Sequence, residues 1–247
     1  MTEAERIESA CADAWPALTE KPLGAWRLRA ADGFTGRANS ALAVGDPGTT
    51  PATALRQVCD FAHAHGIPPM VQVIQDGPIE RQLAGLGWRS CDEYPAGNEV
   101  AVLEGPLMAG AEPGRTRVLA EPTPGWWELT VDRREPADAE RAVLTGGEVV
   151  GYGVAELDGL TAGAVRGAVA DGYLLVARLA VRPEHRRRGL ATELMTAIGG
   201  WGTRHGATRC VLQVSVGNTG ALALYDQLGF REHHRYRYWV PCEDRPL

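Results

Sequence analysis

Three arginines stand directly before a glycine at the start of a predicted helix, in the run RRRGLAT at residues 186–192. The first backbone N–H groups of a helix have no partner inside the helix, and the positive end of the helix dipole lies behind them. Cationic side chains at that end oppose the dipole by about 0.3–1 kcal/mol each, so three of them favour an anionic ligand over a solvated turn. Because Gly189 also lets the backbone approach a ligand, the run predicts a pyrophosphate-type anion site.

The other polar residues exclude several chemistries. His63, His65 and the His233–His234 pair have no carboxylate or cysteine at ligand spacing, which favours surface or packing roles and predicts no metal. No G-x-S-x-G elbow or G-K-[ST] phosphate loop occurs, which excludes hydrolases and NTPases of those types. Neither a disulfide framework nor a C-x-x-C metal site is predicted, because the cysteines are scattered: Cys11, Cys59, Cys91, Cys210 and Cys242.

The elements that must position the arginine run follow from periodicity and turn residues. A strand is expected just before the run and a helix after it. The full expectation for this half is a helical region around 126–142, a strand, a turn at 145–147, a strand at 149–157, a loop, a strand at 173–181, helix 190–203, strand 208–216, helix 219–228 and a last hairpin.

The first half of the chain shows a similar order. It is expected to hold strands at 25–30 and 35–44, helix 51–65, strand 69–74, a short helix at 78–86 and two closing strands. His65-Gly66, Gln72-Val73 and Leu86-Gly87-Trp88 recur in the second half as His205-Gly206, Gln213-Val214 and Leu228-Gly229-Phe230. This echo favours an internal duplication, and the Gly, Pro and Ala-rich stretch 104–115 predicts the boundary between domains 1–112 and 113–247.

Two motifs in this order carry a family resemblance. The first is R-x-x-G-x-A at 186–191 after Leu179-Ala180-Val181, and the second is N-x-x-A-x-x-L-Y-x-x-x-G-F at 218–230. Over roughly residues 149–239 the chain resembles the GNAT superfamily of N-acetyltransferases, and residues 33–40 and 230–238 resemble an actinobacterial group with two such folds in tandem. The resemblance implies an α/β (α+β) protein of two tandem GNAT-like domains, each a mixed, mostly antiparallel twisted sheet flanked by helices.

The resemblance also implies acetyl-CoA as cosubstrate and assigns residues to it. The backbones of Leu179, Ala180 and Val181 would pair with the pantetheine arm and the thioester, and Asn218 would hold the pantetheine or its loop. Tyr225 would protonate the departing thiolate, although a helix tyrosine is commonly a core residue and Asn218 alone would be a helix cap. The pyrophosphate would lie at Arg186, Arg187, Arg188, Gly189, Leu190, Ala191 and Thr192.

The sequence departs from the family pattern at the base that should accept the proton of the amine. Ala177 and Gln213 stand where many members carry carboxylates, so the proton would leave through water or to Glu156, a weak candidate. The first half has Leu83 in place of Tyr225 and GDPGTTP in place of R-x-x-G-x-A, which predicts a degenerate domain without productive CoA binding. Within it, residues 37, 39 and 40 (Arg, Asn, Ser) either line an acceptor site or form a wetted edge strand.

The amino-acid composition limits the classes of partner that the protein can bind. The 247 residues carry 25 basic and 31 acidic side chains, a net charge of −6, which argues against nucleic acid or an anionic membrane as the partner. No run reaches 18 uncharged apolar residues and the amino terminus is acidic, so a cytoplasmic globular monomer or homodimer is expected. Residues 1–112 hold 8 basic and 15 acidic side chains, which suggests that this half favours a cationic amine.

These observations predict an acetyl-CoA-dependent N-acetyltransferase that acts on a primary amine, in a small molecule or a peptide, by direct attack in a ternary complex. No cysteine is placed for a covalent intermediate. The alternatives are a non-catalytic acyl-CoA-binding regulatory protein, which would retain cofactor affinity without turnover, and a scaffold that binds no cofactor.

Overall fold

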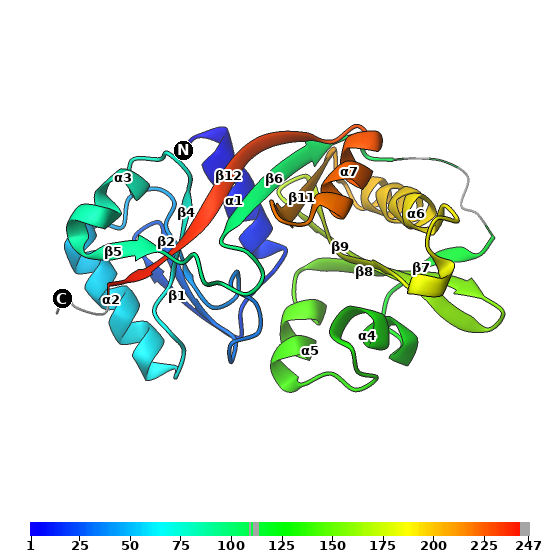
Figure 1. Cartoon of the computed structure of the whole chain (residues 1–247), viewed down its shortest axis with the longest axis horizontal. Helices are drawn as coiled ribbons and strands as arrows, with labels where there is room; N and C mark the ends of the chain where they lie inside the picture. The colour runs from blue at the N-terminus through cyan, green and yellow to red at the C-terminus, as the bar shows by residue number, and fades with distance from the viewer. Residues whose placement is uncertain (109, 111–113, 243–247) are drawn as a thin grey trace.

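In the computed structural model, which describes residues 1–108, 110 and 114–242, one continuous sheet runs through both halves of the molecule (Figure 1). Its strand order is β1-β2-β3-β4-β12-β6-β11-β10-β9-β8-β7, with β5 also paired to β12. Most neighbours are antiparallel, and the α/β (α+β) class is confirmed. The strands are β1 (Thr19–Leu23), β2 (Trp26–Ala30), β3 (Ala41–Leu42), β4 (Val71–Ile74), β5 (Trp88–Ser90), β6 (Glu99–Gly105), β7 (Thr116–Leu119), β8 (Val149–Leu157), β9 (Leu160–Ala170), β10 (Tyr173–Val181), β11 (Arg209–Ser215) and β12 (Arg231–Pro241).

Two strands cross between the halves. β6 lies between β11 and β12, and β12 runs on to pair with β4 and β5. The expected last hairpin is therefore wrong, since β12 is a single strand of 11 residues. The crossing is tight at Gly105, where a Cβ would stand 2.5 Å from the ring of Phe230.

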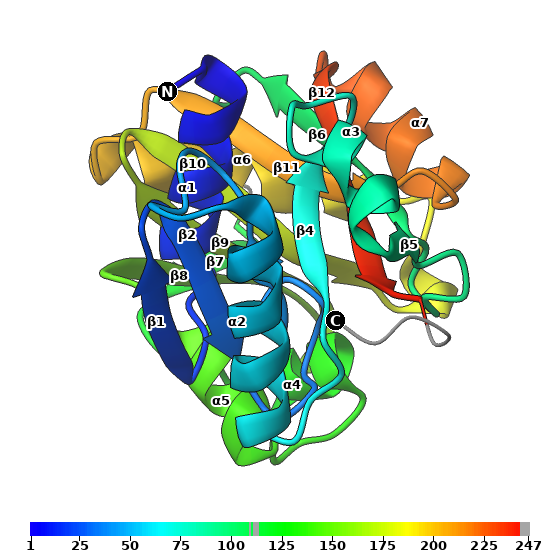
Figure 2. The ribbon, with the colours of Figure 1, turned by 90° about the vertical axis from the view of Figure 1, so that its left-hand side faces the viewer.

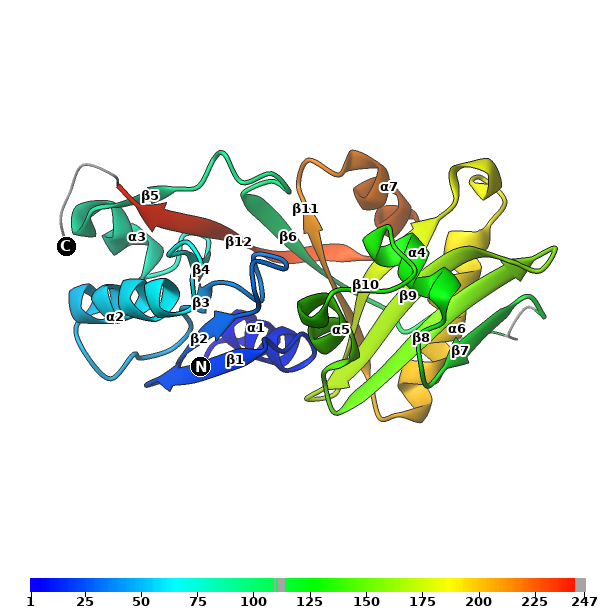
Figure 3. The ribbon, with the colours of Figure 1, turned by 90° about the horizontal axis from the view of Figure 1, so that it is seen from below.

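Helices cover both faces of the second half, as the view from below shows (Figure 3). α6 (Leu190–Arg204) packs on one face of β8, β9 and β10, and α4 (Pro124–Val131) packs on the other face together with α5 (Asp138–Thr145). α7 (Thr219–Gln227) follows β11. In the first half, α2 (Pro51–Ala64) packs against β2 (Figure 2), and the short α3 (Glu80–Leu83) continues as a 3₁₀ turn, Ala84–Leu86.

α1 (Glu3–Asp13), which the sequence analysis did not predict, lies between the two halves (Figure 1). A capping box between Thr2 and Glu5 starts it. Its buried residues Ile7, Ala10 and Cys11 join one core with Trp15, with aromatic side chains of α4 and β12 and with apolar residues of β10. The first helix therefore belongs to the packing of both halves.

β9 was expected to be a loop, because its Ala and Gly-rich sequence carries little strand propensity. Tertiary packing explains the strand. A Cβ at Gly163 would stand 2.9 Å from Leu194, and a Cβ at Gly167 would stand 2.6 Å from Ile198, so small residues let α6 approach the sheet.

The expected strand at 35–44 is also wrong, since only Ala41–Leu42 is extended and paired. The side chain of Asn39 holds the preceding residues in a loop. It accepts from the backbone N–H groups of Ala31 and Gly33 and donates to the carbonyls of Phe34 and Thr35 at 2.9 Å.

Residues 143–145, expected to lead through a strand into a turn, end α5 instead.

The three long predicted helices are confirmed within a residue or two, as α2, α6 and α7. The division at residue 112 stays a prediction, because the stretch 104–115 includes residues 109 and 111–113, which lie outside the described residues. β6 on the amino-terminal side of the proposed boundary pairs with β11 on the carboxy-terminal side. None of the described helices is long and apolar enough to cross a membrane.

Candidate active site

The site begins where β10 and β11 separate. The two strands pair in parallel only from Tyr173 to Val176 on β10. Beyond that point β10 carries a bulge between Ala177 and Ala180, and Arg178 within the bulge has φ of 56°. After the bulge, Ala180 and Val181 pair only with β9 on the other side. The backbone groups that face β11 are therefore available to a ligand.

A groove of about 930 Å³ opens along this separated strand and the start of α6; we call it the loop groove. Ten of the eleven residues assigned to the cofactor from the sequence line it, and so does Tyr225. They are Leu179, Ala180, Val181, Arg186, Arg187, Gly189, Leu190, Ala191, Thr192 and Asn218. Arg188 does not line it; its carbonyl accepts from Arg115 at 3.5 Å. The structure brings these residues together, and their functions stay predictions.

The arginine loop has the backbone expected of an anion site. Arg187 and Gly189 have φ of 62° and 80°, and Gly189 is the N-cap of α6 with no side chain bonded to the helix start. The acidic residue of the first turn, Glu193, forms an ion pair with Arg115, which lowers the pKa of that carboxyl group. Its charge is therefore already paired. Within the part of the chain that the structure describes, no N-cap side chain bonds to the first N–H groups of α6, which leaves them to an external anion.

His185 is a residue of the loop groove that the sequence analysis missed. It ends the 3₁₀ turn Pro183–His185, and its Nδ1 atom is buried without a hydrogen-bond partner among the described residues. A buried polar atom without a partner is costly, so Nδ1 is a natural contact for a polar ligand. Its position directly before the arginine run was the available signal.

Tyr225 lies on α7 with 7% of its surface exposed, and its ring packs edge-on against Phe230. Burial, with a smaller contribution from Cys210, raises the pKa of the phenol to about 12. Because its pKa is raised, the hydroxyl keeps its proton at neutral pH, and Tyr225 lines the loop groove. Asn218 accepts from the Ala221 N–H at 3.1 Å and caps α7, and it also lines the groove.

A second cavity of about 330 Å³, which we call the arginine cavity, adjoins the loop groove. Both are lined by Leu179, Ala180, Asn218, Ala221 and Tyr225. The arginine cavity continues past Ala177 to Arg37, Arg178 and Gln213. Tyr225 therefore stands where the two spaces meet.

No carboxylate lines the arginine cavity among the described residues. Glu156 on β8 is paired with Arg117 at 3.2 Å and lies outside the lining. Gln213 holds Arg37 through its amide oxygen at 2.8 Å, and its amide nitrogen donates to the buried Glu8 at 3.2 Å. Glu8, which the sequence analysis did not single out, thus lies behind Gln213 and does not reach the cavity directly.

The sequence left two roles open for Arg37, Asn39 and Ser40: lining an acceptor site, or forming a solvent-exposed edge strand. The structure gives these residues different surroundings. Arg37 lines the arginine cavity. Asn39 and Ser40 are buried and hold their own loop: Asn39 as described above, and Ser40 by accepting from Arg29. Leu83, the counterpart of Tyr225, is 1% exposed in the core beside Trp26 and Trp88.

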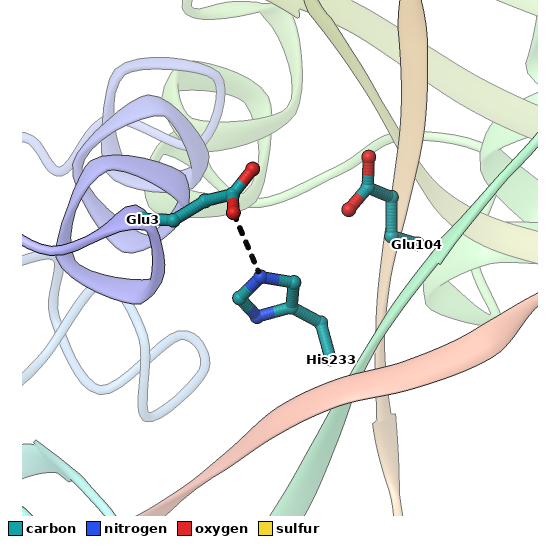
Figure 4. Close-up of side chains that lie close together, drawn as sticks. All are labelled: Glu3, Glu104 and His233. Carbon is teal, nitrogen blue, oxygen red and sulfur yellow. Dashed lines mark ion pairs between the residues drawn. The ribbon is translucent and has the colours of Figure 1, made fainter.

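One cluster brings carboxylates to a histidine, which the sequence spacing did not indicate. Glu3, Glu104 and His233 come from three elements, and their ligand atoms lie within 4.8 Å of one another (Figure 4). Arg209 donates to Glu3 at 2.8 Å and pairs with Glu104 at 3.1 Å. Arg209 thus offsets part of the negative charge of the two carboxylates. His234 faces Glu8 at 3.1 Å.

Comparisons with known proteins bear on the family and the fold of the chain. The model of the family described as "Probable histone acetyltransferase Rv0428c C-terminal" matches residues 2–239. An uncharacterized N-acetyltransferase of Bacillus subtilis, YobR, is 27% identical over 95% of this chain and 98% of its own. Two solved structures share the fold at 18% identity. A GCN5-related N-acetyltransferase from Kribbella flavida covers 98% of this chain and 96% of its own with a TM-score of 0.72. A tandem GNAT protein from the clavulanic acid biosynthesis pathway covers 84% and 76% with a TM-score of 0.63.

Proposed function

Because the chain belongs to the family of the Rv0428c C-terminal acetyltransferase and is a GNAT-type N-acetyltransferase, we propose that it transfers the acetyl group of acetyl-CoA to a primary amine by direct attack in a ternary complex. The observation that carries the proposal is the meeting of the loop groove and the arginine cavity at Tyr225. The loop groove then holds the acyl donor, and the arginine cavity holds the acceptor. Among the described residues, Tyr225 is the only phenol that lines both, and it stands between them.

The residues of the loop groove fit a CoA thioester. The separated part of β10 offers unpaired backbone groups, the start of α6 offers free N–H groups, and His185 offers an unpartnered Nδ1. Acetyl-CoA would supply an activated acetyl carbon and a thiolate leaving group. No metal is part of the proposal.

The chain's own groups would act by orientation and proton transfer. Backbone groups at Leu179 to Val181 hold the donor so that its carbonyl faces the arginine cavity, and Asn218 steadies the turn beside it. As the amine nitrogen bonds to the acetyl carbon and the carbon–sulfur bond breaks, Tyr225 donates its proton to the sulfur. The nitrogen loses one proton to water, and the phenolate regains a proton from solvent.

The first half would bind no CoA and would instead complete the acceptor side, since Arg37 reaches across to Gln213. A chain with two such halves needs no second copy to build this site, and both a monomer and a homodimer are compatible with it. The proposal covers small-molecule and peptide acceptors.

One observation favours a second candidate, a non-catalytic acyl-CoA-binding regulatory protein. No carboxylate lines the arginine cavity within the described residues, so no side chain there can accept the proton of the amine. Such a protein would bind acetyl-CoA without consuming it.

The test measures thiol release from acetyl-CoA with a broad panel of amines, for the wild type and Tyr225→Phe. We expect turnover by the wild type, a fall in kcat of about 10²-fold in the variant and a CoA dissociation constant that changes by less than about threefold. Binding of acetyl-CoA without turnover of any amine would establish the regulatory candidate. Thermal stabilisation by acetyl-CoA is the cheap first measurement, because ligand at about 100 times its dissociation constant adds about 2.7 kcal/mol to the free energy of unfolding.

A further inference from the structure

The arginine cavity contains two guanidinium groups without an anionic partner. Arg37 comes from the loop before β3, and Arg178 comes from the bulge of β10. Arg37 donates to the amide oxygen of Gln213 at 2.8 Å, and Arg178 donates to the carbonyl of Thr130 at 3.3 Å. Both acceptors are neutral, and no described carboxylate forms an ion pair with either arginine. Each guanidinium has five N–H donors, so most of their hydrogen-bonding capacity is unused.

Aromatic rings hold both groups in place. The guanidinium carbon of Arg37 lies 4.2 Å from the ring centre of Trp15, and that of Arg178 lies 5.1 Å from the ring centre of Phe34. Trp15 is 1% exposed, and its indole N–H donates to Thr35. A guanidinium positioned by a ring still directs its donors within its own plane, which matches the two oxygens of a carboxylate.

The positive charges stand in a partly buried place where they disfavour one another. Burial first, and then the charge of Arg37, lowers the pKa of Arg178 to about 10, although Glu140 and Asp132 act in the other direction. A third arginine, Arg166, lies 5.1 Å from the Trp15 ring, but three backbone carbonyls satisfy it. Arg37 and Arg178 are therefore unlike the structural Arg166 beside them, because each keeps donors that an anion can use.

We propose that the acceptor is a small amino carboxylate, such as a free amino acid, whose carboxylate binds Arg37 and Arg178 while its amine faces Tyr225. This inference rests on the proposed function. A cavity of about 330 Å³ lies at the small end of ligand pockets, which suits a free amino acid.

The two arginines that line the arginine cavity disfavour a cationic acceptor, which the acidic composition of residues 1–112 had suggested. Polyamines and lysine-rich peptides would bring further positive charge to two unpaired cations. Among the described residues of 1–112, no acidic side chain lines the arginine cavity, and Arg37 is the residue that contributes to it. The net charge of a half thus does not describe the charge at its site.

The same two cations help to explain the missing base. Two guanidinium groups against one carboxylate leave a net positive charge, which disfavours the ammonium form of a bound amine, so the proton is lost more readily to water. The carboxylate of the acceptor and the nucleophilic form of its amine would therefore depend on the same pair of side chains.

The experiment uses the full chain with saturating acetyl-CoA and compares each amino acid with the amine that lacks its carboxylate, such as lysine with cadaverine and β-alanine with ethylamine. O-Phosphoethanolamine is included because a guanidinium pair also binds phosphate. We expect at least one amino acid to exceed its partner amine in kcat/KM by about tenfold or more, the range for hydrogen bonds to a charged group.

Variants locate the effect. Arg37→Gln should raise the KM of the amino acid by about tenfold and remove the preference over its partner amine, with the KM of acetyl-CoA unchanged. Arg37→Lys should keep part of the preference, because the charge remains. Arg56→Gln, on the exposed face of α2, is the matched control and should behave as the wild type.

The outcomes separate the inference from the proposed function. If amines without a carboxylate are acetylated as well as their amino acids, or if O-phosphoethanolamine is clearly preferred, the inference fails and the acetyltransferase stands. If no amine is acetylated, the proposed function fails, and thermal stabilisation with CoA present decides the inference. N-acetyl amino acids that stabilise the wild type but not Arg37→Gln support it; no stabilisation beyond that of the matching neutral acetamides overturns it.

Discussion

Tyr225 combines two properties that sequence alone leaves as alternatives. It is a core residue, packed against Phe230, and its buried phenol also lines both the loop groove and the arginine cavity. Burial disfavours the charged form of the phenol, which keeps the proton that a general acid must donate. Core packing and proton donation are therefore compatible at this residue.

The pH dependence of turnover follows from the raised pKa of Tyr225. With a pKa of about 12, the phenol stays protonated through the range in which an ordinary tyrosine, near 10, loses its proton. We expect kcat to show no alkaline fall from this residue up to about pH 10. The measurement is the pH profile of kcat for the wild type, with circular dichroism at each pH to exclude unfolding. An alkaline fall centred near pH 10 that Tyr225→Phe removes would contradict the assignment.

At the level of elements, the bulge of β10 and the start of α6 create the site by what they leave unpaired. The bulge turns β10 away from β11 after Val176, and the glycine cap leaves the first N–H groups of α6 without a side-chain partner. A regular strand and a serine-capped helix at these positions would satisfy their own hydrogen bonds and offer fewer to a ligand.

Gly189→Ala tests the start of α6. Its φ of 80° costs an L-residue about 1–2 kcal/mol, and we expect the free energy of unfolding to fall by that amount and the CoA dissociation constant to rise about tenfold. Gly206→Ala is the control, because Gly206 has φ of 88°, open space around its Cβ position and no place in the loop groove. Calorimetry of both variants measures binding and stability. Equal loss of CoA affinity in the two would show that backbone strain alone is responsible.

At the level of the whole molecule, a buried network joins the two halves through Glu8. The Glu8 carboxylate, 1% exposed on α1, accepts from Gln72 of β4 at 2.6 Å and from Gln213 of β11 at 3.2 Å, and it faces His234 of β12. Gln213 in turn positions Arg37. The network connects the sheet of the first half to the lining of the arginine cavity in the second.

Glu8→Gln should lower the free energy of unfolding by about 1–3 kcal/mol, because an amide N–H₂ group replaces an oxygen that accepts buried hydrogen bonds. Urea unfolding measures the change. The exposed Glu135→Gln is the matched control, for which we expect a change below about 0.5 kcal/mol. A similar small change in both variants would mean that the network contributes little to stability.

Because β6 pairs with β11 and β12 pairs with β4, we expect the two halves to fold together. Fragments 1–112 and 113–247 expressed separately should fail to fold, since β11 loses its neighbour β6 and β4 loses its neighbour β12. Co-expression should restore a complex that CoA stabilises, and the intact chain should unfold in one calorimetric transition. A folded fragment 113–247 that binds CoA by itself would contradict this prediction.

Elements and motifs with local signals could be predicted from the order of the amino acids alone. The helix patterns of α2, α6 and α7, the arginine run with its glycine, and the spacing from Asn218 to Phe230 are all readable over short windows. They were sufficient for the family, the fold class and the residues that the structure gathers around the loop groove. Arg188 alone of those cofactor candidates lies outside the groove lining.

Features that depend on residues far apart in the chain became visible in the folded molecule. β9 is a strand because α6 packs onto its glycines, and β12 is one long strand because β6 occupies the place beside β11. The pairing of Arg37 with Gln213, and of Glu8 with residues of β4, β11 and β12, has no local signature. The charge of the arginine cavity likewise depends on which few side chains the fold directs into it, and a sum over 112 residues cannot report that.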